Sequence, residues 1–115
     1  LALNVVNGND IIHCGESLRV FVMMRNQTGG MLQTSYRVYA GLHPFRPLRN
    51  VFGPVNLNMN RTYNKYADPL TYVVPIPNRR RIYNVTAYFG AIVTDRNSGR
   101  LLGQTECPVR VLPPR

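Results

Sequence analysis

The chain has 115 residues, of which 44% are hydrophobic and 17% are charged. This length fits one domain with one core, and this composition excludes an intrinsically disordered chain. No apolar run approaches the roughly 20 residues of a membrane-spanning helix, so we expect no membrane span. The net charge is +9, and Lys65 is the one lysine among 14 basic residues. Arginine binds phosphate, sulfate and carboxylate by paired hydrogen bonds, so the charge indicates either an anionic partner or a merely soluble basic surface.

The first part of the chain reads as short strands separated by turns. The predicted strands cover residues 1–6, 11–14, 17–25 and 33–40. Apolar residues alternate through 17–25, which turns Phe21 and Met23 away from the core. These two side chains form an exposed apolar patch or are covered by a loop.

The pattern is lost between residues 41 and 69, where prolines and asparagines recur. We predict a long loop there, with a short strand near 55–58 as an alternative. Long loops in small domains are often functional. A strand over residues 70–76 follows, and its prolines predict a sheet edge.

The clearest pattern is a β-hairpin near the end of the chain. Two β-branched and aromatic runs, 83–94 and 100–112, flank the turn Asp95-Arg-Asn-Ser-Gly99. Alternation places Phe89 and Val93 on the apolar face and Glu106 on the other. A one-residue slip would expose the apolar face, so the register is well specified.

No segment has helical periodicity, and about seven short strands predict an all-β, antiparallel β-sandwich formed by residues 1–115 as one domain. The strand opening Gly15-Glu-Ser-Leu-Arg-Val and the final Val111-Leu-Pro-Pro resemble immunoglobulin-like domains in the broad sense. The resemblance implies a sandwich of two sheets. No functional residues are carried over from it.

Cysteines and glycosylation sequences indicate an extracellular, secreted protein. The only two cysteines, Cys14 and Cys107, predict one disulfide that closes most of the chain into a loop. A free, buried pair is the alternative. Asn26, Asn60 and Asn84 each begin an Asn-x-Thr acceptor sequence for N-glycosylation.

Catalysis and metal binding find little support in the sequence. Asp10 and Asp95 sit in turn signals, where aspartate caps backbone groups. His13 and Cys14 are adjacent, so in a strand they point to opposite faces and do not pair. The two histidines are far apart and no Cys-x-x-Cys occurs, so we predict no metal site, no cofactor and no enzyme.

The best candidate for a binding site interleaves basic and aromatic residues, a mixture that suits stacking together with anion contacts. The predicted partner-binding residues are Phe45, Arg46, Arg49, Arg61, Tyr63, Lys65, Tyr66, Arg79, Arg80 and Arg81. The alternative is structural: the apolar residues Phe45, Leu48, Val51 and Phe52 pin the loop to the sandwich, and the arginines are only solvated.

The sequence is consistent with three functions. The first is a secreted, non-catalytic binding module that contacts a protein or an anionic glycan. The second is a structural subunit of a fibre or capsid projection that self-associates through sheet edges by strand addition. The third is a nucleic-acid-binding protein, which occupied glycosylation sites and a formed disulfide would argue against.

Overall fold

The computed structural model describes residues 1–8, 10–66, 70–73 and 84–115, and these residues form strands and loops without a helix. The strands are β1 (Ala2–Asn7), β2 (Ile11–His13), β3 (Ser17–Arg25), β4 (Leu32–Gly41), β5 (Arg49–Met59), β6 (Asn64–Tyr66), β7 (Leu70–Val73), β8 (Val85–Asp95) and β9 (Leu101–Leu112). Within these ranges no helix is long and apolar enough to cross a membrane.

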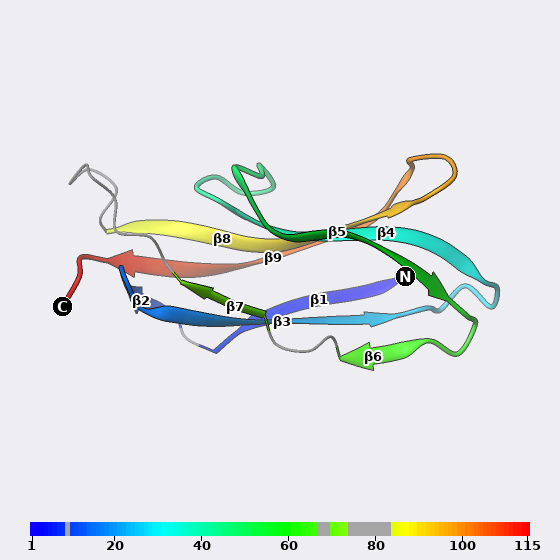
Figure 1. Cartoon of the computed structure of the whole chain (residues 1–115), viewed down its shortest axis with the longest axis horizontal. Helices are drawn as coiled ribbons and strands as arrows, with labels where there is room; N and C mark the ends of the chain where they lie inside the picture. The colour runs from blue at the N-terminus through cyan, green and yellow to red at the C-terminus, as the bar shows by residue number, and fades with distance from the viewer. Residues whose placement is uncertain (9, 67–69, 74–83) are drawn as a thin grey trace.

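The strands form two sheets that face one another (Figure 1). One sheet has the order β1-β3-β6, and β7 pairs with the same strand β3 further along its length. The other sheet has the order β2-β9-β8-β4-β5. Between the described strands, every pairing is antiparallel except that of β2 with β9, which is parallel. The predicted all-β sandwich is therefore confirmed, with nine strands in the described residues rather than about seven.

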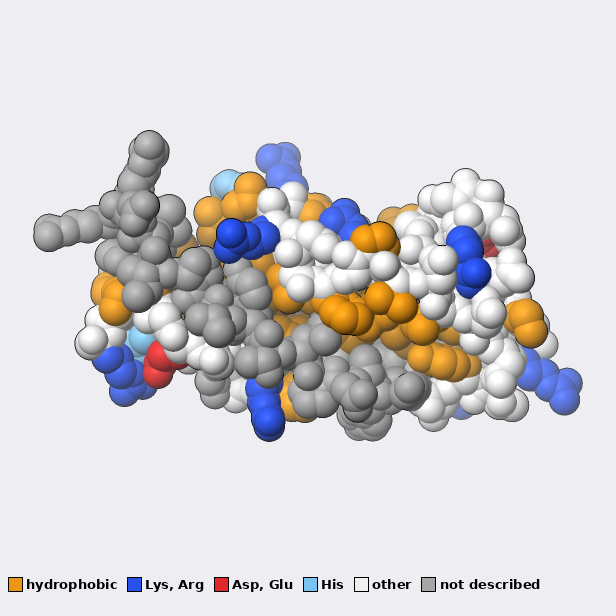
Figure 2. All heavy atoms as spheres, in the orientation of Figure 1, with side chains coloured by type: hydrophobic (Ala, Val, Ile, Leu, Met, Phe, Trp, Pro, Cys, Tyr) orange, Lys and Arg blue, Asp and Glu red, His pale blue; other side chains and the backbone are white. Residues whose placement is uncertain are grey.

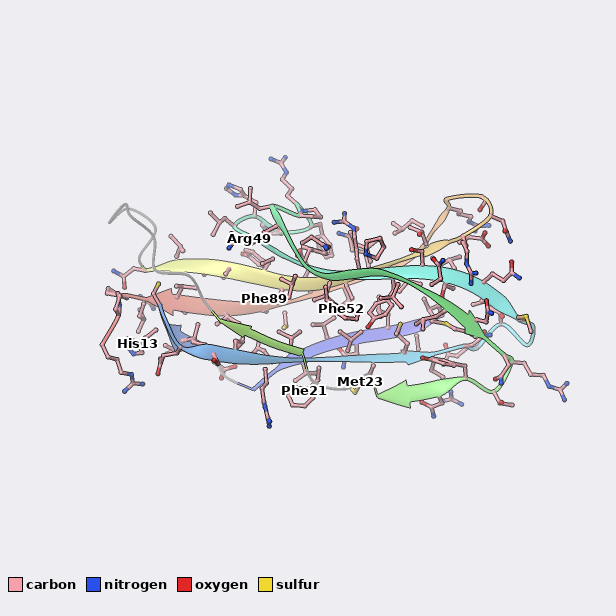
Figure 3. All side chains as sticks on the ribbon, viewed as in Figure 1. His13, Phe21, Met23, Arg49, Phe52 and Phe89 are labelled. Atoms are coloured by element: carbon pink, nitrogen blue, oxygen red, sulfur yellow. The ribbon has the colours of Figure 1, made fainter. Side chains whose placement is uncertain are left out.

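The core is the apolar layer between the sheets. Phe89 of β8, labelled between the layers in Figure 3, is 2% exposed. Other fully buried core side chains include Ile12, Leu18, Val20, Val22, Val38, Met59, Val93 and Val109. They come from both sheets, so the alternation along each strand produces one shared core.

The predicted hairpin is confirmed as β8 and β9. Phe89 pairs with Cys107 and Val93 with Gly103, and the apolar face predicted for β8 is the buried one. At the start of β9, the register with β8 shifts between Val93 and Thr94. This irregularity turns Leu101 outward, where it is 55% exposed.

The predicted strand over residues 17–25 is β3, and it alternates between buried and more exposed positions. Phe21 and Met23 lie on the side of β3 away from the core, as expected (Figure 3). Both are only partly exposed.

The long loop predicted over 41–69 is wrong, because β5 occupies 11 of its residues. Among the described residues, β5 is an edge strand with β4 as its one neighbour in the sheet. An edge strand tolerates proline, and Pro54 lies in it. The β4–β5 register also shifts near Val38, which breaks the alternation that would reveal a strand. Phe52 packs on the ring of Tyr36 with centroids 5.8 Å apart.

The predicted Cys14–Cys107 disulfide is wrong, because both cysteines are free. The backbone N–H of Cys14 donates to the Leu112 carbonyl, whereas Cys107 lies five residues earlier in β9. At about 3.4 Å per residue the two positions are roughly 17 Å apart, and a disulfide needs Cα atoms within about 7 Å. The Cys107 Sγ instead accepts a hydrogen bond from Asn7 Nδ2 at 3.0 Å.

We expect the native protein to carry two thiols and no disulfide. Burial raises the pKa of both thiols, so the difference in reactivity comes from access: Cys14, 5% exposed, should be alkylated more slowly than the partly exposed Cys107. Mass spectrometry of peptides after timed alkylation without reductant measures both rates. A Cys14–Cys107 cross-linked peptide would contradict the register of β2 on β9.

Candidate functional site

The loop between β4 and β5, residues 42–48, stands away from the outer face of the five-stranded sheet (Figure 1). Two backbone hydrogen bonds shape it: Arg46 N–H donates to the His43 carbonyl at 3.3 Å, and Leu48 N–H donates to the Ala40 carbonyl at 3.0 Å. The tip is thus a tight turn from His43 to Arg46 rather than an open coil.

Phe45 occupies a backbone conformation that its side chain does not favour. Its φ is 56°, which for a residue with a Cβ costs about 1–2 kcal/mol. Pro44 before it suits the second position of such a turn, but glycine or asparagine is the usual third residue. The Phe45 side chain is 59% exposed. The fold therefore holds an aromatic ring in water at a conformational cost, a combination that suggests function.

Three side chains of the sheet hold this turn in place. The Tyr39 hydroxyl donates to Glu106 Oε2 at 2.5 Å and accepts from Gln104 Nε2 at 3.0 Å. The other carboxylate oxygen of Glu106, Oε1, accepts the backbone N–H of Phe45 at 2.7 Å. We call Tyr39 and Glu106 the clamp. Bonds to a carboxylate are stronger than neutral ones, so the clamp offsets part of the cost of the Phe45 backbone.

Gly90 makes the clamp possible. It pairs with Tyr39 on one side and Glu106 on the other, at the centre of the outer face. A Cβ on Gly90 would lie 2.5 Å from the Tyr39 hydroxyl. Gly41 has a similar role at the base of the loop, where a Cβ would overlap the Arg46 carbonyl oxygen.

Burial, followed by the hydrogen bond to Glu106, raises the pKa of Tyr39. Tyr39 is fully buried although it points away from the core. Its hydroxyl therefore remains a proton donor to Glu106 at neutral pH.

Phe45 and Arg46 lie in this loop, and Arg49 begins β5 directly after it; as partner-binding residues, all three stay predictions. Figure 2 shows apolar and basic side chains gathered at the upper edge of the molecule, where the β4–β5 loop stands in Figure 1. Phe45 and Leu48 are exposed, so they do not pin the loop to the sandwich. Phe52 does pack on the core.

The other predicted partner-binding residues do not join this group. Arg61 and Tyr63 follow the far end of β5, roughly 33 Å along the strand from Arg49 at about 3.3 Å per residue. Lys65 and Tyr66 lie in β6 of the other sheet. The residues Arg79, Arg80 and Arg81 lie outside the described residues.

The three glycosylation sequences differ in the structure. Asn26 is 4% exposed, and its Nδ2 donates to the carbonyls of Gly30, Met59 and Asn60. This arrangement leaves no amide hydrogen for a glycan, so Asn26 is corrected from an acceptor to a structural residue. Asn60 is exposed, and Thr62 Oγ1 donates to its Oδ1 at 3.0 Å. Asn84 is also exposed, and both stay predicted acceptors.

Tyr39, Gln104 and Gly90 are not among the predicted site residues, and Glu106 enters the predictions only through its face of the hairpin. One signal was available: a glycine inside a strand pattern, such as Gly90, often marks a close approach by another group. Its partner could not be identified, because that requires the alignment of β4 beside β8.

The comparisons with known proteins show the fold. No protein-family model and no curated protein matches the chain. Among solved structures it is similar to the CARDB domain of the PF1109 protein from Pyrococcus furiosus, a structure in complex with di-metal ions. The identity is 16%, the TM-score is 0.64, and the match covers 97% of this chain and 94% of that chain. The chain is thus an immunoglobulin-like β-sandwich, which confirms the predicted fold class. In the described part of this chain, no three His, Cys, Asp or Glu side chains form a group that could hold a metal.

Gly90→Ala should destabilise the fold, because the new methyl group overlaps the Tyr39 ring. We expect a loss of about 1–3 kcal/mol in the free energy of unfolding, measured by urea denaturation. Gly8→Ala is the matched control, since nothing lies within 4 Å of its Cβ position. Equal stability of the two variants would show that Tyr39 is not fixed over Gly90.

Stability should fall at alkaline pH partly through Tyr39. Its folded pKa is raised above the unfolded value of about 10, so above about pH 10 the unfolded chain loses a proton that the folded chain keeps. The stabilisation is present below the unfolded pKa and is lost as pH rises. In Tyr39→Phe the loss of stability between about pH 8 and about pH 11 should be smaller than in the native protein, by urea denaturation at both values. An identical loss would exclude this contribution.

Proposed function

We propose that this chain is a non-catalytic, extracellular binding module that recognises an anionic partner through the β4–β5 loop. The observation that carries the proposal is the loop together with the start of β5: residues 42–48, Arg49 and Asn50 are all exposed, and the clamp fixes the turn that presents them. Binding residues are often placed on loops that a rigid scaffold positions. The β-sandwich is such a scaffold.

The chemistry of the loop indicates the kind of partner. Arg46 and Arg49 supply planar cations that suit carboxylate, sulfate or phosphate. Phe45 adds an exposed ring beside them. A protein surface or an anionic glycan offers the required anions, and the net charge of +9 favours encounter with either one.

Three of the four described side-chain carboxylates, those of Glu106, Asp95 and Glu16, support a role without catalysis. Glu106 is engaged by Tyr39 and Phe45. Asp95 accepts the backbone N–H groups of its own turn. Glu16 accepts the backbone N–H of His13. Each of these acids has a structural use, and their roles account for their positions without a reaction.

The extracellular part of the proposal rests on Asn60 and Asn84, whose side chains are exposed. Asn-x-Thr sequences are acceptors only in proteins that enter the secretory route. Because the two cysteines are free, the proposed extracellular location depends on Asn60 and Asn84.

Strand addition at β5 is a second candidate function. β5 is an 11-residue edge strand, and no charged residue occurs between Asn50 and Asn60. Charges and prolines protect sheet edges from pairing with another chain, and Pro54 alone supplies that protection here. Self-association would appear as a concentration-dependent mass in analytical ultracentrifugation.

The double variant Arg46→Ser, Arg49→Ser should bind heparin, a model anionic glycan, less tightly than the native protein. Two exposed ion contacts are worth about 1 kcal/mol together, or about fivefold in affinity, and elution from heparin resin at lower salt measures the change. Arg19→Ser, Arg25→Ser removes the same charge from exposed positions on β3 and is the control. Equal shifts in both variants would show that only net charge matters and would contradict a site at the loop.

A further inference from the structure

The β4–β5 loop, together with Arg49 at the start of β5, repeats one chemical unit three times. An apolar residue is followed directly by a basic one in Leu42-His43, Phe45-Arg46 and Leu48-Arg49, and a proline separates each unit from the next. The apolar side chains are 39%, 59% and 72% exposed, respectively. The basic side chains are exposed as well.

This clustering of exposed apolar side chains is confined to one place. Seven large hydrophobic side chains are exposed in the described residues, and three of them belong to this seven-residue loop. Scattered exposed apolar residues need no explanation, but a contiguous group marks an interaction surface.

Hydrogen bonds from the sheet to the loop backbone keep these apolar side chains from packing against the sheet. The Glu106 carboxylate binds the Phe45 N–H, and the Ala40 carbonyl binds the Leu48 N–H. Both anchors hold the backbone of the loop and leave its apolar side chains outside. The backbone of the loop stands away from the sheet (Figure 1), and its exposed side chains are apolar and cationic.

We propose that the β4–β5 loop docks on the surface of an anionic phospholipid bilayer. The apolar side chains of Leu42, Phe45 and Leu48 would enter the boundary between headgroups and acyl chains. His43, Arg46 and Arg49 would meet the phosphates and other anionic headgroups. This inference rests on the proposed function, because it names the partner of the same loop.

A bilayer surface fits this loop better than the other anionic partners. A sulfated glycan offers charge and a surface for Phe45, but it has no apolar phase for Leu42 and Leu48. Leucine is also under-represented among the residues that dominate protein–protein binding. Interfacial lipid binding depends on both buried apolar area and attraction to anionic lipids, which are the two properties that the loop alternates.

The chain offers a direct probe, because it contains no tryptophan. Leu48→Trp places a single indole at the most exposed apolar position of the loop. Vesicles of phosphatidylcholine mixed with phosphatidylserine should shift its fluorescence to the blue, and brominated lipids should quench it. Vesicles of phosphatidylcholine alone should do neither. Leu101→Trp, also exposed but at the start of β9, is the matched control and should not change.

Sedimentation with the same mixed vesicles measures affinity without a probe. Leu48→Ser should weaken binding by about tenfold, the effect of removing one apolar side chain from the boundary. Arg46→Ser should weaken it by about fivefold, the effect of one cation at an anionic surface. Leu101→Ser and Arg100→Ser are controls for each change. Thermal unfolding of every variant verifies that it is folded.

The outcomes separate this proposal from the more general one. Binding to heparin through the loop without binding to mixed vesicles would overturn the lipid proposal and leave the anionic-partner function standing. Vesicle binding with no change in the indole fluorescence of the Leu48→Trp variant, or with equal losses in the Leu48→Ser and Leu101→Ser variants, would overturn docking by the apolar tip. Loop-independent binding to both heparin and vesicles would overturn both proposals.

Discussion

Val38 and Tyr39 are neighbours in β4, and neither is exposed to solvent. Side chains of adjacent strand residues point to opposite faces, so the five-stranded sheet must be covered on both sides at this point. On the inner side, Val38 is covered by the opposite sheet. On the outer side, Tyr39 lies over Gly90 and is joined to the loop through Glu106. The need to cover both faces of β4 couples the core of the domain to its candidate binding site.

This coupling explains why the loop has a defined shape although its side chains are solvated. An ordinary solvated loop minimises the cost of order by remaining mobile. Here one carboxylate satisfies both a buried hydroxyl and the N–H of the strained Phe45. Because an unpaired buried polar group is costly, the sheet and the loop stabilise each other. The loop can then present apolar groups without a hydrophobic contact of its own.

Local patterns in the sequence were sufficient to predict the hairpin and β3. One face of each is apolar, and a register slip of one residue would expose that face. They did not predict β5, because its register shift against β4 and its edge position remove the alternation of apolar and polar residues. The predictions of a disulfide and of a glycan on Asn26 were wrong for another reason. Both depend on which distant residues become neighbours, namely the position of β2 along β9 and the carbonyls around the Asn26 amide. Phe45, Arg46 and Arg49 stay predicted binding residues, whereas the clamp depends on the pairing of three strands and has no local signature.

The parallel pairing of β2 with β9 has a mechanical consequence. β2 follows β1 near one end of the described chain, β9 lies near the other end, and the two run in the same direction, so tension that reaches both strands pulls them past one another. Their hydrogen bonds, with that from Cys14 to Leu112, are then loaded together in shear instead of being opened in turn. A domain connected in this way resists stretching more than one whose terminal strands peel apart. If the module is one link in a chain of domains, force on its neighbours would leave the clamp and the loop in place until this short ladder gives way.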